Sequence, residues 1–256
     1  LQYQLIKKIS KEDPRINGSD LPPAIINLTD TCGTFAFDYQ SIYSPSGLNP
    51  DYSGVMGLNN FDDSWGIWGH NLRKVLGDNV DKVYATIHGK TDDSQLCFSS
   101  EEMYRQIESY IVDNIGEKGS SRFVIAPDDT PYACTCASCT AMGNTEKNAT
   151  PAVTELLLRL SQRFPKHSFF TISYLSTKQV TDKQLPSNAG IIVSAIDFPL
   201  RRIDGKNAQE KKFMQQLNQW KKASKNIYIW DYINNFDDYL TPFPILKIAQ
   251  QRLRFF

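Results

Sequence analysis

The stretch FVIAPDD at residues 123–129 decides the fold prediction. Its first four residues are apolar and indicate a short buried strand, which ends at Pro127 and two aspartates. After a cysteine-rich loop, the pattern predicts a helix from about Pro151 to Phe164, with one apolar face and a proline in its first turn. A strand followed by a helix is the repeating unit of a parallel α/β sheet.

The same unit recurs on both sides of this stretch. We predict strands at Tyr3–Lys7, Gly66–Asn71, Leu96–Phe98, Phe123–Ala126, Phe169–Leu175, Gly190–Ile196 and Asn226–Tyr232. Further helices are expected at Leu72–Leu76, from Ser99 to about Ile115, at Ala208–Lys222 and from Ile245 onward.

Seven strands are one fewer than a (β/α)8 barrel contains, and the last helix runs to Phe256, where an eighth strand would follow. We therefore predict an α/β fold of the TIM-type (β/α)8 barrel, cropped before its last strand, with an open sheet as the alternative. Residues 1–256 are expected to form a single barrel domain, in which residues 14–63 are an irregular segment.

Composition narrows the choice of partners. Lys plus Arg and Asp plus Glu number 28 each, so no basic face is implied and nucleic acid is not an expected partner. No apolar run approaches membrane-spanning length. Aromatic residues make up 12% of the chain, which suits either a large core or a cleft in which sugar rings stack on aromatic side chains. The sequence leaves the oligomeric state open.

Polar and aromatic side chains gather where the predicted strands end. In a barrel, the carboxyl ends of the strands converge on one face, and that face holds the active site. We therefore predict one substrate pocket built from Asp128 and Asp129 and lined by Trp68, His70, Asn71, Tyr174, Asp197, Trp230, Asp231 and Tyr232.

Asp128 and Asp129 are the predicted catalytic pair. Glycoside cleavage needs a proton donor for the leaving oxygen and a second group that stabilises the oxocarbenium-like centre. A 2-acetamido sugar can supply its own nucleophile, so the enzyme then needs one carboxylate to orient the amide and one acid to protonate the leaving group. Adjacent carboxyls can do both, because crowded like charges raise the pKa of one of them. The alternative is an ordinary Asp-Asp turn or helix cap.

The five cysteines are Cys32, Cys97, Cys134, Cys136 and Cys139, three of them in the stretch CTCASC. Thiolates at the C-x-C-x2-C spacing can share a structural zinc ion, with Cys97 completing a tetrahedral set. Disulfides and free thiols are the alternatives, and disulfides would be favoured in an exported protein. No histidine pattern accompanies the cysteines, so we expect no metal or other cofactor in catalysis.

Several stretches together resemble one known family. They are WGIWGHNL at 65–72, QLCF at 95–98, APDD at 126–129 with the three clustered cysteines, IWDY at 229–232 and PFP at 242–244. They look like the bacterial family first catalogued as domain of unknown function 4838 and now associated with glycoside hydrolase family 163. The resemblance implies a barrel-based, exported protein and, as activity, an endo-acting β-N-acetylglucosaminidase working on N-glycans. The family pattern resembles an Asn-Asp pair, so Asp129 matches it and Asp128 departs from it. The adjacent aspartates also look like the pair in O-GlcNAc-removing hydrolases.

The leading hypothesis is a retaining, substrate-assisted glycosidase acting on a β-linked N-acetylhexosamine of a glycan. A second hypothesis is a non-catalytic carbohydrate-binding barrel, which would bind glycans without cleaving them. A third is a structural fragment stabilised by a cysteine-bound metal.

Overall fold

The computed structural model describes residues 37–45, 47–77, 80–117, 119, 121–201, 203–235, 237–238 and 241–256. The chain divides into two compact units, residues 1–64 and residues 65–256. The predicted strand Tyr3–Lys7 and Cys32 lie outside the described residues.

The described part of the first unit holds two short helices, α2 (Pro50–Val55) and α3 (Phe61–Ser64). Asn49 caps α2, because its side chain accepts a hydrogen bond from the backbone N–H of Asp51. The ring of Tyr43 packs edge-on against that of Phe61, with 5.8 Å between the ring centroids.

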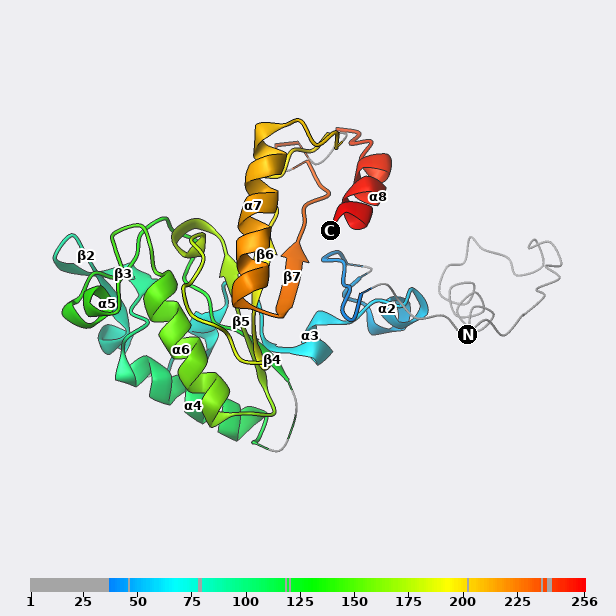
Figure 1. Cartoon of the computed structure of the whole chain (residues 1–256). Helices are drawn as coiled ribbons and strands as arrows, with labels where there is room; N and C mark the ends of the chain where they lie inside the picture. Colours follow the sequence, from blue (N-terminus) through cyan, green and yellow to red (C-terminus); the bar gives the residue numbers. More distant parts are fainter. Residues whose placement is uncertain are drawn as a thin grey trace. The chain divides into compact units, whose positions relative to one another are not determined.

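The second unit is built on a five-stranded parallel sheet, which confirms the predicted α/β class (Figure 1). Its strands follow one another across the sheet in chain order: β1 (Trp65–Ile67), β4 (Arg122–Val124), β5 (Ser168–Ser173), β6 (Ala189–Ser194) and β7 (Asn226–Trp230). Each of these strands lies within a few residues of a predicted one.

Four helices of this unit lie close to predicted ones: α4 (Glu101–Asn114), α6 (Thr150–Arg163), α7 (Ala208–Ala223) and α8 (Leu246–Phe255). The helix predicted at Leu72–Leu76 is the 3-10 turn η1 (Leu72–Val75). The short helix α5 (Ala137–Ala141) and the turns η2 (Val80–Lys82) and η3 (Leu175–Thr177) were not predicted. Ser100 caps α4 through the N–H of Met103. Within the described residues, no helix has both the length and the apolar character needed to cross a membrane.

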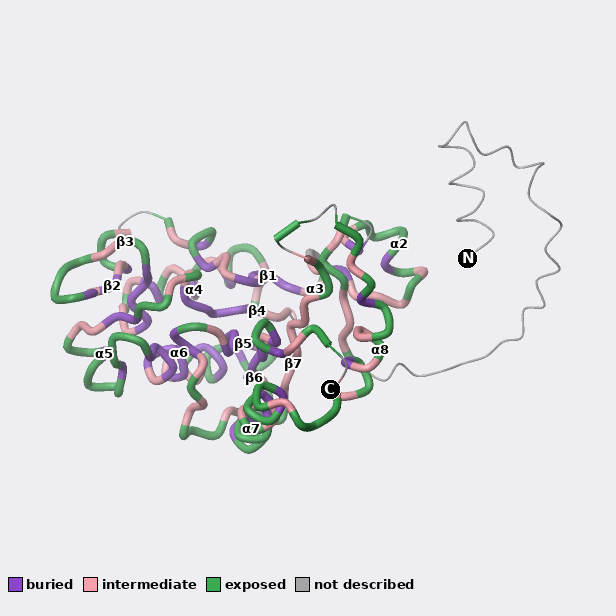
Figure 2. Tube along the Cα trace, turned by 90° about the horizontal axis from the view of Figure 1, so that it is seen from above, coloured by how far each residue is buried: buried purple, intermediate pink, exposed green. Residues whose placement is uncertain are grey.

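Helices cover one face of the sheet. Phe123 of β4 and Phe169 of β5 stack on each other and share a buried cluster with α4 and α6. On the same face, Ile191 and Val193 of β6 share a second buried cluster with α7. Buried segments gather along these strands and along α4 and α6 (Figure 2).

Aromatic rings fill the opposite face. The ring centroid of Trp65 on β1 lies 5.4 Å from that of Phe170 on β5 and 6.0 Å from that of Tyr228 on β7. β1 and β7 are the two edges of the sheet, and in a flat sheet four strand spacings would separate them by about 19 Å. The sheet is therefore strongly curved, with its aromatic face on the inside. Gly190 on β6 permits this packing, because a Cβ there would lie 2.5 Å from the ring of Phe170.

The predicted parallel strand at Leu96–Phe98 is wrong. Leu96 instead ends an antiparallel hairpin of β2 (Tyr84–Ile87) and β3 (Lys90–Leu96) that forms a separate two-stranded sheet. His88 and Gly89 both have positive φ, as a two-residue turn of this kind requires. Most of β3 is polar and solvent-facing, so it carries no hydrophobic period that would reveal it.

Candidate functional site

Asp129 lies in the loop after β4 and faces two tyrosines from neighbouring strand ends. Tyr174 follows β5 directly and Tyr232 lies two residues after β7; both are half-buried, whereas Asp129 is exposed. Burial raises the pKa of the Tyr174 phenol, and the charge of Asp129 and a hydrogen bond to it raise that pKa further. Burial likewise raises the pKa of Tyr232; a hydrogen bond with Ser194 opposes this, and the charges of Asp129 and Asp231 add to it.

His70 joins the same group from the loop after β1. Its Nδ1 lies 2.6 Å from the carbonyl oxygen of Pro127, and its ring centroid lies 5.9 Å from that of Tyr174. A carbonyl oxygen only accepts, so Nδ1 carries the proton and Nε2 of the neutral ring is left as an acceptor. The predicted residues Asp129, His70, Tyr174 and Tyr232 are thus brought together.

Asp128 has different partners from its neighbour. Its carboxylate pairs with the guanidinium of Arg73 on η1, at 2.8 Å from Nε and 2.7 Å from the nearer terminal nitrogen. The hydrogen bond from Arg73 and its attraction to Asp128 raise the pKa of Arg73, against a smaller effect of burial. Two consecutive carboxylates therefore serve different contacts.

A tryptophan pair lies between the ends of β1 and β7. The ring centroids of Trp68 and Trp230 are 5.9 Å apart, with the ring planes tilted by 33°. Gly69, which has a φ of +63°, makes the turn between Trp68 and His70, and the side chain of Asn71 donates to the Trp68 carbonyl at 2.8 Å. Both tryptophans are partly exposed and offer flat apolar surface at the ends of the two edge strands.

The other two predicted carboxylates are engaged by cations. Asp231 accepts two hydrogen bonds from Arg252 of α8, one of them 2.7 Å long, and Arg252 is only 1% exposed. The same guanidinium donates to the carbonyls of Ala195, Phe198 and Pro199, so it ties the loops after β6 and β7 to α8. Asp197 pairs with Lys178.

Sequence reasoning missed these cationic partners. The signal for Arg252 is only its place on the inward face of an amphipathic helix, a position where arginine is unexpected.

A second constellation is formed by Cys97, Cys134, Cys136 and Cys139, whose sulfurs all lie within 4.8 Å of one another. The Cys97 sulfur is 3.7 Å from that of Cys136 and 3.8 Å from that of Cys139. Four sulfurs at about 2.3 Å from one tetrahedral zinc ion would be about 3.8 Å apart, whereas a disulfide needs about 2.05 Å. These four cysteines are free thiols, and their spacing fits a shared metal ion.

The surroundings of the cysteines suit thiolates. The backbone N–H of Thr86 donates to the Cys134 sulfur at 3.2 Å, and that of Cys139 donates to the Cys136 sulfur at 3.5 Å. Hydrogen bonds from Cys139 and then Cys97 lower the pKa of Cys134 to about 3, whereas the pKa of Cys139 is raised. A divalent cation bound among these sulfurs would favour their thiolate forms. The sequence prediction that these four residues meet is confirmed.

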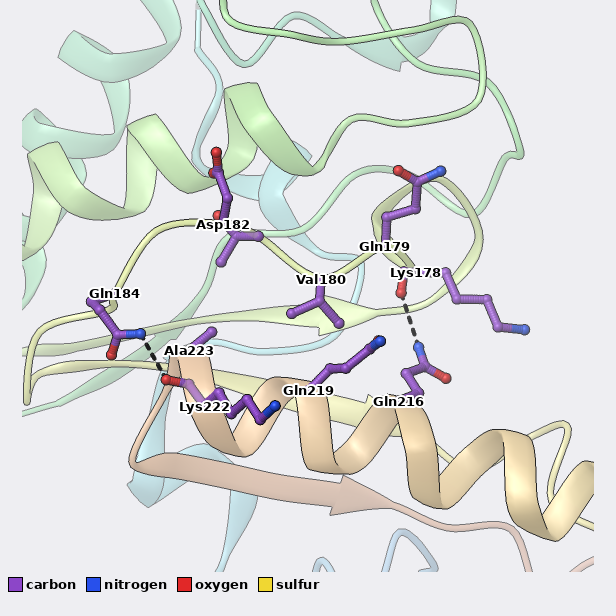
Figure 3. A pocket seen from close by; sticks show the side chains of 10 residues that line it. Lys178, Gln179, Val180, Asp182, Gln184, Gln216, Gln219, Lys222 and Ala223 are labelled. Atoms are coloured by element: carbon purple, nitrogen blue, oxygen red, sulfur yellow. Dashed lines mark hydrogen bonds between the residues drawn. The ribbon is translucent and has the colours of Figure 1, made fainter.

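A groove of about 530 Å³ lies elsewhere, between the β5–β6 connection and α7 (Figure 3). Its walls are polar and include Lys178, Gln179, Asp182, Gln216 and Gln219. Its lining residues include none of the predicted site residues and no aromatic ring, and it is not where the strand ends converge.

Fold and site together define an α/β protein with a polar cluster at the ends of parallel strands and a four-cysteine centre. The family model for a domain of unknown function, DUF4838, matches residues 72–256, and the chain belongs to this family. Comparison with curated proteins gave no match, and neither did comparison with solved structures.

Proposed function

We propose that this chain is a glycoside hydrolase, similar to glycoside hydrolase family 163, that cleaves a β-linked N-acetylhexosamine in N-glycan-type substrates. The observation that carries the proposal is the exposed Asp129 carboxylate, which acts on both Tyr174 and Tyr232, together with the Trp68–Trp230 pair at the ends of β1 and β7. Carboxyl groups and exposed aromatic rings are typical of sites that bind and cleave sugars.

The proposal includes a TIM-type (β/α)8 barrel as the complete fold. Two features of the sheet support it. Successive parallel strands lie side by side in chain order, and the rings of Trp65 and Tyr228 meet across the inner face from the two edge strands. In a barrel, the strand ends that carry Asp129 would line the mouth, where active sites of this fold lie.

In the proposed mechanism, Asp129 is the general acid and base, and the reaction retains configuration. The acetamide oxygen of the substrate bonds to C1 while the glycosidic C1–O bond breaks, and the leaving oxygen takes the proton of Asp129. Water then attacks C1, its proton returns to Asp129, and the bond from C1 to the acetamide oxygen breaks. His70 Nε2 accepts the acetamide N–H and so aligns the nucleophile. Trp68 and Trp230 hold the sugar rings.

Asp128 has no direct part in this proposal. Its ion pair with Arg73 makes it a support for the loop, in place of the catalytic partner expected from the sequence.

Hydrolysis of an N-glycan array, followed by mass spectrometry, tests the proposal. The wild-type chain should release a product cut at an N-acetylglucosamine linkage, and Asp129→Asn should release none while keeping the same circular dichroism spectrum. Equal product from Asp129→Asn and wild type would refute the assignment. The masses also report which linkage is cut.

A non-catalytic carbohydrate-binding protein is the second candidate. Asp128, Asp197 and Asp231 all pair with cations, which leaves Asp129 as the one carboxylate of the predicted set without a cation partner among the described residues. Glycosidases usually need two catalytic carboxyl groups. A single unpaired carboxylate therefore favours glycan binding without cleavage, unless His70 takes part in the reaction. Glycan binding by wild type and Asp129→Asn alike, without products, would support this candidate.

We further propose that the four-cysteine centre holds a structural zinc ion. Its all-sulfur donor set, the 3.7 and 3.8 Å sulfur separations and the backbone N–H donors suit tetrahedral Zn²⁺. A bound zinc would also keep the thiols from oxidising in the exported location that the family resemblance implies. One zinc per chain by elemental analysis is expected, and none in Cys139→Ser.

A further inference from the structure

The segment from Asp128 to Cys139 joins the proposed catalytic residue to the cysteine centre, and the β2–β3 hairpin contacts it at both ends. These contacts come from Gln95 near the end of β3, from Thr86 in β2 and from Cys97 just after β3.

Gln95 holds the end that carries Asp129. Its Oε1 accepts from the backbone N–H of Asp128 at 3.0 Å. Its Nε2 donates to the Asp128 carbonyl at 3.3 Å, to the Thr130 hydroxyl at 3.0 Å and to the Tyr132 carbonyl at 3.2 Å. These contacts flank Asp129 on both sides. Gln95 is 1% exposed, so water cannot take the place of these hydrogen bonds when they are lost, and their loss costs free energy.

Thr86 and the cysteines hold the other end. The Thr86 N–H donates to the Cys134 sulfur, and its carbonyl accepts from the N–H of Thr135 at 2.8 Å and from the Thr135 hydroxyl at 3.1 Å. Cys97 brings its sulfur to Cys136 and Cys139. A metal bound by these thiolates would cross-link the hairpin to the far end of the same segment.

We propose that the β2–β3 hairpin positions Asp129, with Gln95 as the positioning residue at one end of the Asp128–Cys139 segment and the metal-bound cysteines as the anchor at the other. Loss of either anchor lets the Asp129 carboxylate move while the parallel sheet stays folded. The inference rests on the proposed metal centre and, for activity alone, on the proposed glycosidase.

Gln95→Glu and metal removal test the two anchors separately. Gln95→Glu keeps the size and the acceptor of the side chain but removes the amide donors. Gln184→Glu is the matched control, because the amide of Gln184 also donates to a backbone carbonyl, that of Lys222, far along the chain from the segment. The metal is removed from the wild type with a chelator and restored with zinc.

Two readouts need no turnover. The first is amide hydrogen exchange of residues 128–135, which should speed up by at least about tenfold in Gln95→Glu, because the change removes three hydrogen bonds of the buried Gln95 amide and places a carboxylate against two carbonyl oxygens. The second is the titration of Tyr174, followed by tyrosine NMR and assigned with Tyr174→Phe. Asp129, Tyr232 and Asp197 are the charged or titratable groups that act on Tyr174, and the ring of His70 lies 5.9 Å from its ring. Displacement of Asp129 should lower the pKa of Tyr174, as Asp129→Asn should.

Gln95→Glu and metal-free protein should both shift the Tyr174 titration in that direction, and Gln184→Glu should not. An unchanged titration and unchanged exchange in both would overturn the proposal. Global unfolding on metal removal would also overturn it, since the centre would then be needed for the whole fold. If Gln95→Glu does not fold, Thr135→Val, which deletes only the hydroxyl contact to Thr86, tests the cysteine end of the segment by the same two readouts. A wild type without turnover would count against the glycosidase and leave these readouts intact.

Discussion

The strand-end group around Asp129 and the four-cysteine centre are both polar clusters. They differ in burial and in how far their polar groups contact one another. Three of the four cysteines are buried, and each sulfur lies close to the others. Asp129 is exposed, and its neighbours Tyr174, Tyr232 and His70 are only partly buried. A buried, mutually satisfied cluster contributes to stability, whereas an exposed carboxylate held among half-buried donors is available to a ligand. The comparison therefore agrees with the two proposals, a structural role for the cysteines and a ligand-binding role for the Asp129 group.

The largest expected effect is that of metal removal on stability. A metal present at about 1,000 times its dissociation constant contributes about 4 kcal/mol. For a unit of this size that corresponds to a fall in Tm of about 8–16 °C on chelation. Differential scanning calorimetry with and without zinc measures the fall. Cys136→Ser should abolish the dependence on zinc, and a Tm that ignores zinc in the wild type would contradict a structural metal.

Arg252→Met should cause the next largest loss of stability. It leaves Asp231 without its buried partner, and breaking a buried ion pair costs about 3–5 kcal/mol. We expect about 3 kcal/mol because the Asp231 side chain is 23% exposed and water can reach it. Urea unfolding measures the loss. Arg254→Met, a change at an exposed position of the same helix, should stay within about 0.5 kcal/mol of wild type.

Trp230→Ala should weaken glycan binding by about tenfold, because it removes one wall of the tryptophan pair. Calorimetric titration of an N-glycan into the Asp129→Asn background separates binding from turnover. Trp220→Phe, a change at a buried position of α7, should leave the dissociation constant unchanged. Equal affinities of Trp230→Ala and its parent would remove the tryptophans from the site.

The smallest expected effect concerns alkaline pH. The pKa of Tyr174 is raised in the folded protein, so the protonated phenol favours the folded state. This contribution is complete below the ordinary tyrosine pKa of about 10 and is lost as the pH rises through the higher folded value. The Tm of the wild type should therefore fall slightly more than that of Tyr174→Phe between about pH 10 and pH 11. Parallel curves would show that the pKa of Tyr174 is not raised on folding.

Local patterns predicted the regular part of the fold well. The apolar runs of β4, β5, β6 and β7, the Ser100 cap and the single-faced helices are encoded within short windows, where side-chain period decides the structure. The β2–β3 hairpin was not predicted, because β3 is largely polar and exposed and its pairing depends on a tight turn at His88 and Gly89.

The sequence predicted which side chains lie near one another at the strand ends and in the cysteine cluster, but not which carboxylates pair with cations. The sequence predicted that Cys97 meets Cys134, Cys136 and Cys139. It did not predict that an antiparallel hairpin brings Cys97 to them. Asp128 differs from Asp129 because it pairs with Arg73, which is 55 residues away in the chain. Asp231 likewise pairs with Arg252 in the last helix. Contacts of this range have no local signature, so only the folded chain shows which carboxylate has a cation partner.

The rates of Asp128→Asn and Asp129→Asn on one N-glycan, compared with wild type, test the division of labour most directly. We expect Asp129→Asn to lose about 10²–10⁴-fold in turnover, the usual contribution of a general acid and base, and Asp128→Asn to lose far less. A larger loss in Asp128→Asn than in Asp129→Asn would contradict the account.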